Sequence, residues 1–594
     1  MPPVRLAACV ACCGLLLAAS SPVPAAPAPA APEAPAASAP AGAFAPMSDL
    51  IGFGSSGESF GEYPRTFPRL KELGVHGVRM FPEWAGIQPR QGEWDWSGAD
   101  RLVATARENG IKVLGVFCYF APWSSSRDGD TRAFPVRDMQ FWRDYVKACV
   151  ARYKDDIDAW EVWNEPNSGA FNKGGSVKDY ADLVREAWRA AKEVLPKVRI
   201  GVTCASFDVN YLDQVMSQGA AGCFDFVAVH PYNSIDFLFG SEASYLGMGA
   251  NLRKLLEKHK MPATTEMWIT EIGLTTPGAA DANARQAEAL AKVFLLSAAQ
   301  GFRKVFWFEA LGPRYGDGDF SILNADCSLR PSGQAAGVLA RTLGARRYAG
   351  WLDPEGKGYG FLFDGEGGPV LAVWAPPKTD LKMRFASPVA TVDMTGKETA
   401  VAAQEDVVLG TMPLLVKDPP ADLVQAARAH LAQPFPWGTD YAKEREAWCR
   451  LAAANTHHGV VQKEWGDGAT TAGLVAGDAY RSTNKAKGSN YMYCDVDNTF
   501  AAFGDNDLDI TVSVRCAPGQ KGTLRLCYES LTGYHEAPGT WAVPGDDQWY
   551  EHTFHVTDAN FADTWGWNFR IDVAGSPGDV WVKGVTVKRN GPKK

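Results

Sequence analysis

The chain has 594 residues, 46% of them hydrophobic and 21% charged, which is typical of globular domains and excludes a disordered chain. This length predicts two to four domains. The net charge of −9 gives no electrostatic case for nucleic acid or an anionic membrane surface as a partner.

The first residues have the features of a targeting segment. Arg5 precedes the start of the apolar stretch "LAACVACCGLLLAA", which is too short for a stop-transfer helix, and "VPAAPA" supplies small residues for cleavage. We therefore expect a signal peptide at 1–25 and an exported protein, secreted or periplasmic. A lipoprotein is the alternative, because Leu6-Ala7-Ala8-Cys9 resembles a lipobox, although it precedes the apolar core. The Ala/Pro-rich residues 26–46 predict a linker, and no other run reaches transmembrane length.

Residues 47–343 alternate short β-rich runs with amphipathic helical runs, from "LIGFG" before "FPRLKELG" to "KVFWFEAL" before "SGQAAGVLARTLG". Eight strand–helix units in roughly 300 residues are the number and size of an α/β (β/α)8 TIM barrel. Glycines in "ELG", "ENG" and "AQG" mark helix ends. A doubly wound sheet is the alternative, but no glycine-rich phosphate loop follows the first strand. We predict the barrel.

Two β-sandwich-like modules are expected after the barrel. Residues 344–418 contain short strands separated by turn residues, and a helical linker at 419–433 leads to a second sandwich at 434–594. We expect this last module to resemble a carbohydrate-binding module. Its Trp549, Trp565 and Trp567 are either sugar platforms or sandwich core, and core is the favoured interpretation.

Metal and redox interpretations find little support in the sequence. The nine cysteines after the signal segment lack C-x-x-C spacing, and their odd number leaves at least one thiol without a partner in the chain. His457-His458 has no nearby cysteine or patterned acidic residue, and the acidic stretch "DVDNTF" to "GDNDLD" is only a weak calcium candidate. We therefore predict no metal and no cofactor.

The active site of a (β/α)8 barrel lies at the C-terminal ends of its strands, so the residues at those ends are the candidates. Two of them, Glu165 in "WEVWNEPN" and Glu271 in "WITEIGL", follow the fourth and seventh strands, which stand across the barrel mouth. Two facing carboxylates suit glycosidic cleavage, with one as acid and the other ionised. A separation of about 5 to 5.5 Å predicts retention of configuration, and a wider one predicts inversion. The other candidates are Arg79, Tyr119, Trp123, Asn164, His230, Tyr232 and Trp307.

With "VAVHPY" and "VFWFEALG", these motifs resemble the retaining glycoside hydrolases of clan A, most of all family 39 and its relatives. "ITEIGL" and "HPY" also suit families 5 and 53. The resemblance covers about 47–343, or up to 418 at most, and implies that Glu165 is the acid/base and Glu271 the nucleophile. It further implies roles around the substrate. Asn164 donates to the sugar 2-hydroxyl, Arg79 and Tyr232 hold Glu271, and His230 lines the pocket; Trp307 forms its apolar floor, with Tyr119 and Trp123 as further walls.

The function expected from these residues is hydrolysis of a polysaccharide or oligosaccharide through a covalent glycosyl-enzyme. One alternative is a carbohydrate-binding protein that no longer hydrolyses, which retention of both carboxylates argues against. Another is a transglycosylase with the same pair. If Trp307 belongs to the barrel core, Phe306 or Phe308 faces the sugar instead. The sequence leaves the sugar, the linkage, endo or exo cleavage and the oligomeric state open.

Overall fold

The structure is a computed structural model that describes residues 44–591 except 277–279, 316–317, 465, 502–503 and 505. The predicted signal peptide and nearly all of the predicted linker lie outside the described residues. Among the described residues, no helix combines the length and the hydropathy that a bilayer span requires.

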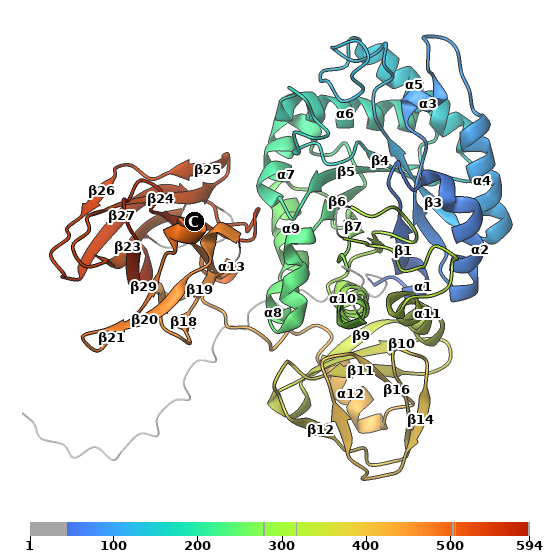
Figure 1. Ribbon diagram of the computed structural model, residues 1–594. Helices are drawn as coiled ribbons and strands as arrows, with labels where there is room; N and C mark the ends of the chain where they lie inside the picture. The colour runs from blue at the N-terminus through green and yellow to red at the C-terminus, as the bar shows by residue number, and fades with distance from the viewer. Residues whose placement is uncertain are drawn as a thin grey trace, which may run out of the picture. The chain divides into compact units, whose positions relative to one another are not determined.

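The first part of the chain is a closed barrel of eight parallel strands, in which β8 pairs with β1. A helix follows each strand, and the helices surround the strands (Figure 1). This confirms the predicted (β/α)8 fold. The strands are β1 Ile51–Gly54, β2 Gly77–Arg79, β3 Lys112–Phe117, β4 Ala159–Val162, β5 Arg199–Ala205, β6 Phe226–His230, β7 Glu266–Ile272 and β8 Lys304–Trp307. The helices are α2 Tyr63–Leu73, α4 Ser97–Asn109, α5 Met139–Tyr153, α6 Val177–Val194, α7 Val209–Val215, α9 Met248–Lys258, α10 Ala280–Ala299 and α11 Pro331–Leu343.

Local sequence signals set several of these helix ends. Helix α2 stops at Gly74, which takes a φ of +79° that a side chain would strain, and its N–H bonds back to the last turn. Helix α6 begins with a capping box, in which Ser176 and Asp179 satisfy each other's backbone N–H groups. Because all eight strands are parallel, their C-terminal ends, and with them the loops that carry the candidate residues, lie on one face of the barrel.

The lower part of the barrel interior is apolar. Six side chains from five strands form one separate cluster, and the rings of Phe226 and Trp268 stack in it with centroids 3.9 Å apart. Because side chains alternate between the two faces of a strand, residues two positions further along the same strands also point inward, nearer the C-terminal mouth. The cluster contains Leu114, Ala159, Phe226, Ala228, Trp268 and Phe306.

Antiparallel sheets follow the barrel, in agreement with the predicted sandwich modules. The first is a six-stranded sheet in the order β14-β13-β16-β11-β10-β9, with a separate β12–β15 pair, and the last part is a network of 13 strands with its own apolar core. Helix α12, Ala421–Ala429, lies between them in the sequence. The strands of the first module are β9 Arg347–Leu352, β10 Tyr359–Asp364, β11 Val370–Trp374, β12 Leu381–Met383, β13 Val389–Val392, β14 Glu398–Val401, β15 Val407–Leu409 and β16 Leu414–Lys417. Those of the last module are β17 Glu446–Arg450, β18 Thr456–His458, β19 Val460–Lys463, β20 Thr471–Val475, β21 Asp478–Ser482, β22 Tyr491–Val496, β23 Asn506–Cys516, β24 Gly522–Ser530, β25 Gly533–Glu536, β26 Trp541–Val543, β27 Tyr550–Ala559, β28 Phe569–Asp572 and β29 Val580–Arg589.

The nine cysteines from Cys118 to Cys527 are all free thiols in the structure. Seven of them are buried and two are partly exposed. Most therefore act as small apolar side chains in the cores.

Candidate active site

A polar layer lies above the apolar cluster inside the barrel. Arg79 from β2 donates from Nε to Glu161 Oε2 at 2.7 Å, and the Thr270 hydroxyl of β7 donates to Glu161 Oε1 at 3.1 Å. The same hydroxyl lies 3.0 Å from His230 Nε2. Glu161 and His230 are completely buried and Arg79 is 4% exposed, so this layer is closed to bulk solvent.

Glu271 stands on the polar layer at the end of β7. Arg79 Nη1 donates to its Oε1 at 2.5 Å, and the Tyr232 hydroxyl donates to its Oε2 at 3.2 Å. The carboxylate is 12% exposed, which leaves it open to a ligand above. Arg79 and Tyr232, the predicted partners of Glu271, therefore both contact it. Arg79 also pairs with Glu161, so one guanidinium group binds two carboxylates.

Glu165 approaches from the loop after β4. Its backbone φ is +47° and that of Trp163 is +70°, a left-handed conformation in which non-glycine residues are strained. This turn aims the carboxylate at His230, whose Nδ1 lies 2.9 Å from Glu165 Oε1. The Glu165 side chain is 18% exposed. Strain of this kind persists where surrounding structure enforces it, and here it holds an acidic group at the barrel mouth.

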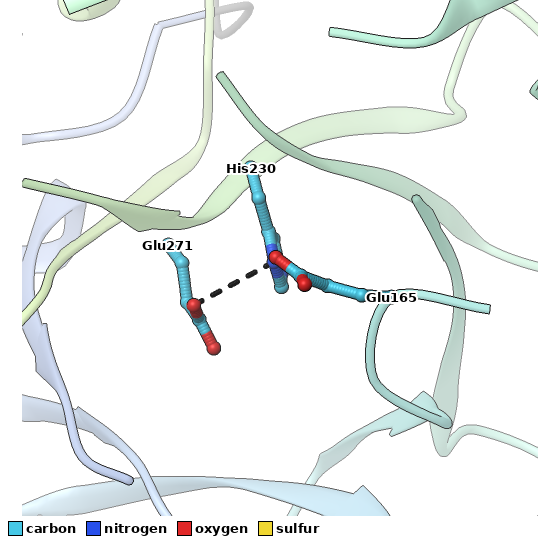
Figure 2. A group of neighbouring side chains, drawn as sticks. All are labelled: Glu165, His230 and Glu271. Atoms are coloured by element: carbon cyan, nitrogen blue, oxygen red, sulfur yellow. Dashed lines mark hydrogen bonds and ion pairs between the residues drawn. The ribbon is translucent and has the colours of Figure 1, made fainter. Parts of the chain in front are cut away.

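The two carboxylates and His230 converge on one point, as Figure 2 shows. One oxygen of Glu165, one oxygen of Glu271 and one nitrogen of His230 all lie within 4.8 Å of one another. Such a triangle also has the spacing of a metal site, and it is the one group of this kind among the described residues. However, Arg79 already supplies a positive charge to Glu271, and both ring nitrogens of His230 have hydrogen-bond partners. We therefore assign the three residues to a hydrogen-bonded cluster and not to a metal centre.

Electrostatic coupling fixes the charge states in this cluster. Burial alone would raise the pKa of Glu161, but the charge of Arg79 and the interaction with His230 outweigh it and lower the pKa to about 2. Burial alone would lower the pKa of His230, but the charge of Glu271 and the interactions with the nearby carboxylates of Glu161 and Glu165 raise it to about 9. The pKa of Arg79 is raised, because Glu161 and Glu271 outweigh the effect of burial.

Glu165 shows the same coupling. Burial would raise its pKa, yet the hydrogen bond and charge of His230, with that of Arg79, lower it. Because the two groups are coupled, a proton bound at this point belongs to the Glu165–His230 pair and not to Glu165 alone.

Asn164 and the predicted aromatic walls also lie near the strand ends. The Asn164 Oδ1 atom accepts from Arg79 Nη2 at 2.9 Å, so its NH₂ group is the end left to donate. Tyr119 is 6% exposed; its ring stacks on Phe171 and lies edge-on to Trp163. Trp123 is partly buried, and its indole N–H donates to Gln88 O at 2.9 Å.

Trp307 does not form the predicted apolar floor. Phe306 belongs to the barrel interior, so its neighbour Trp307 points outward between the barrel and the helices, where it is completely buried. By the same alternation, Phe308 points back into the barrel mouth. The Phe308 ring packs on Phe320, which in turn packs on Tyr232, the donor to Glu271. The alternative that placed Phe308 against the sugar is the one that fits this geometry.

The sequence reasoning missed Glu161 and Thr270. Both have a signal in hindsight, because each lies two residues beyond an inward-facing position on its strand and carries a polar group into an apolar run. The inward or outward direction of each side chain along its strand was the information needed, because a buried Glu in "AWEVW" requires a cation and a buried Arg79 requires an anion.

The fold and this site resemble those of one class of protein, the clan A glycoside hydrolases: a (β/α)8 barrel with a pair of carboxylates at its mouth. The glycosyl hydrolase family 10 profile matches residues 81–203, which include β4 and Glu165. Endo-1,4-beta-xylanase 3 of Hypocrea jecorina is 27% identical over 211 residues, which are 32% of this chain and 55% of that enzyme. Endo-1,4-beta-xylanase A of Halalkalibacterium halodurans is 29% identical over 136 residues, 19% of this chain and 33% of that enzyme.

A solved structure described as a family 39 glycoside hydrolase from Bacteroides cellulosilyticus WH2 shares the fold. It matches with a TM-score of 0.52 and 21% identity, over 63% of this chain and 81% of that chain. The chain spans about half or less of the curated relatives it matches. The chain is thus similar to the retaining glycoside hydrolases of clan A. Its residues 81–203 are similar in sequence to family 10, and its fold is similar to that of a family 39 enzyme.

Proposed function

We propose that this protein is a retaining glycoside hydrolase that cleaves O-glycosidic bonds of a polysaccharide or oligosaccharide. The observation that carries the proposal is the approach of Glu165 and Glu271 to within 4.8 Å at the barrel mouth. Retaining enzymes hold their carboxylates about 5 to 5.5 Å apart, whereas inverting enzymes need roughly 6.5 to 9.5 Å to admit a water. The short separation therefore supports double displacement.

In this mechanism Glu165 protonates the departing oxygen while Glu271, oriented by Arg79 and Tyr232, attacks the anomeric carbon. The anomeric carbon–oxygen bond breaks as the bond to Glu271 forms. Glu165 then takes a proton from water, which releases the sugar and regenerates the free carboxylate. We further propose that Asn164 donates its NH₂ group to the sugar 2-hydroxyl; the bond from Arg79 to the Asn164 oxygen supports this orientation of the amide.

Xylan is the first substrate to test, because both relatives named above are endo-1,4-beta-xylanases. Incubation with a 2-deoxy-2-fluoro glycoside should trap a covalent adduct on Glu271, identified by peptide mass spectrometry. Glu165→Gln should lower kcat/KM by about 10²–10⁴ on substrates with poor leaving groups. An inverted product, or full activity of Glu165→Gln on such a substrate, would overturn the proposal. Disaccharide products with added acceptor sugar would favour the transglycosylase instead.

The last module is proposed to bind glycan. Trp565 is 65% exposed, whereas Trp567 is 8% exposed and packs against Tyr534. Glu529 accepts the backbone N–H groups of residues 562–564, which fixes the loop that presents Trp565. A rigid, exposed indole face suits stacking on a sugar ring. Full-length Glu271→Gln should be retained on insoluble xylan, and adding Trp565→Ala should release it; equal retention of both would show that Trp565 is not the platform.

Export is proposed from the sequence at 1–25. The protein produced in its native host should occur outside the cytoplasm without these residues, which N-terminal sequencing of the recovered protein checks. Recovery only in the cytoplasm with Met1 intact would contradict export.

A further inference from the structure

Glu161 occupies a position that the proposed chemistry does not use. It lies on β4 below the cleft, completely buried, and its carboxylate oxygens are bound from two sides. Arg79 donates to both oxygens, at 2.7 and 3.4 Å, and the Thr270 hydroxyl donates to Oε1 at 3.1 Å. No substrate can reach it. Any effect of Glu161 on catalysis must therefore pass through the residues that it holds.

The hydrogen of the Thr270 hydroxyl is committed to Glu161. A carboxylate with a pKa of about 2 is ionised and can only accept, so the hydroxyl must be the donor in this bond. A hydroxyl has a single hydrogen, which leaves its lone pairs for His230 Nε2 at 3.0 Å. Nε2 must then carry a proton in order to donate to Thr270.

This assignment decides what the other ring nitrogen can do. With a proton on Nε2, neutral His230 has a bare Nδ1, and its 2.9 Å contact with Glu165 Oε1 then requires a protonated Glu165. If His230 is charged, Nδ1–H donates to an ionised Glu165. Both arrangements place one proton in the His230–Glu165 bond, and only its loss leaves two lone pairs facing each other.

We propose that Glu161 is a positioning residue that, through Thr270, holds His230 with its proton on Nε2 and so keeps the acid proton in the His230–Glu165 hydrogen bond. Glu161 also anchors Arg79, which holds Glu271, so one buried carboxylate supports both halves of the site. This inference rests on the proposed function for its catalytic meaning, but the placement of the protons is independent of it.

The negative charges that face His230 all favour its protonated form. Glu161 Oε1 lies 3.6 Å from Nε2, and Glu271 Oε2 lies 3.6 Å from Nδ1. Both favour the protonated ring, as Glu165 does, while the positive charge of Arg79 opposes it. Removing the charge of Glu161 therefore destabilises the protonated pair, and its proton should leave at lower pH.

The test compares three variants of the full chain. Glu161→Gln removes the charge, and Thr270→Val keeps the charge but cuts the link to His230 with little change in shape. The control is Glu242→Gln, which alters another completely buried carboxylate, paired with Lys292 at 2.8 Å outside this site. For the folded variants, the pH profile of kcat/KM is measured on an aryl glycoside, and the ring NMR signal of His230 is titrated after assignment with His230→Asn.

Glu161→Gln should move the basic limb of the profile, and the His230 titration, to lower pH by about one to three units. Thr270→Val should move both in the same direction by a smaller amount, and Glu242→Gln should move neither. If Glu161→Gln does not fold, Thr270→Val decides alone. An unchanged profile and titration in a folded Glu161→Gln or Thr270→Val would overturn the proposal. If the wild type cleaves no glycoside, the NMR titration still tests the proton placement, so the two failures are distinguishable.

Discussion

Replacing Arg79 with Met should destabilise the barrel and slow catalysis together. Arg79 is the cation between Glu161 and Glu271, and its loss leaves the completely buried Glu161 with only His230, at 3.6 Å, as a positively charged neighbour. Removing one partner of a buried ion pair typically lowers the free energy of unfolding by about 3–5 kcal/mol. The depression of the Glu161 pKa from 4.5 to about 2 corresponds to about 3 kcal/mol, which agrees with this range.

The pH dependence gives this prediction its sign. In the wild type the folded pKa of Glu161 is depressed, so its stabilisation is complete above the unfolded pKa near 4.5 and is lost as pH falls towards 2. In Arg79→Met the buried carboxyl of Glu161 favours its protonated form. Acidification therefore reduces the loss of stability in this variant. The stability gap between wild type and variant should therefore be widest at neutral pH and narrow on acidification.

Urea unfolding followed by tryptophan fluorescence measures this gap, with the barrel transition analysed by itself because several modules do not unfold as one two-state unit. The kcat/KM of Arg79→Met should fall roughly tenfold to a hundredfold, since a hydrogen bond to a charged group contributes about 1.5–3 kcal/mol. Lys292→Met is the control: it breaks a buried pair with Glu242 and should lose stability but keep kcat/KM. Wild-type stability in Arg79→Met, or a gap that widens on acidification, would refute the reasoning.

Three further predictions follow from the site. Phe308→Ala should raise KM with the fold intact, whereas Trp307→Phe should lower the unfolding midpoint and leave KM unchanged; the reverse pattern would restore Trp307 as the floor. Because the raised pKa of His230 is about 9, kcat/KM should stay level through neutral pH and decline as pH rises through about 9, and a decline already complete near pH 7 would contradict the coupling to Glu165. Dialysis against EDTA should leave kcat/KM unchanged, and a loss reversed by a divalent cation would reassign Glu165, His230 and Glu271 as metal ligands.

The barrel and the pair Glu165 and Glu271 were predictable because they depend on patterns local in sequence. Eight changes between strand and helix periodicity define the fold, and the ends of the strands define the face of the site. The inward or outward direction of a side chain within a strand is different, because it depends on where the strand starts. In "KVFWFEAL" three aromatic residues follow one another, and only the contact of Phe306 with the barrel interior shows that Trp307 points outward.

Glu161 was missed because its role depends on contacts with residues that are distant in the sequence. Arg79 and Thr270 are 82 and 109 residues away from it. A single charged residue in a strand can occur in several environments, including an exposed position at the edge of a sheet. Only barrel closure, which brings β2, β4 and β7 around one interior, turns it into a buried anion with two donors.

The polar layer costs free energy, because it buries charged groups, and packing alone does not explain why it is there. A barrel interior filled with apolar side chains would avoid the desolvation of Arg79, Glu161 and His230, and replacing buried charges with apolar groups is often neutral or stabilising. The strained backbone at Trp163 and Glu165 adds a further cost. Both are concentrated below one point at the barrel mouth, where the proposed mechanism needs a proton and a negative charge close together without neutralising each other. The separate supports for Glu165, through His230, and for Glu271, through Arg79, meet that requirement, which a solvated pair of carboxylates would not.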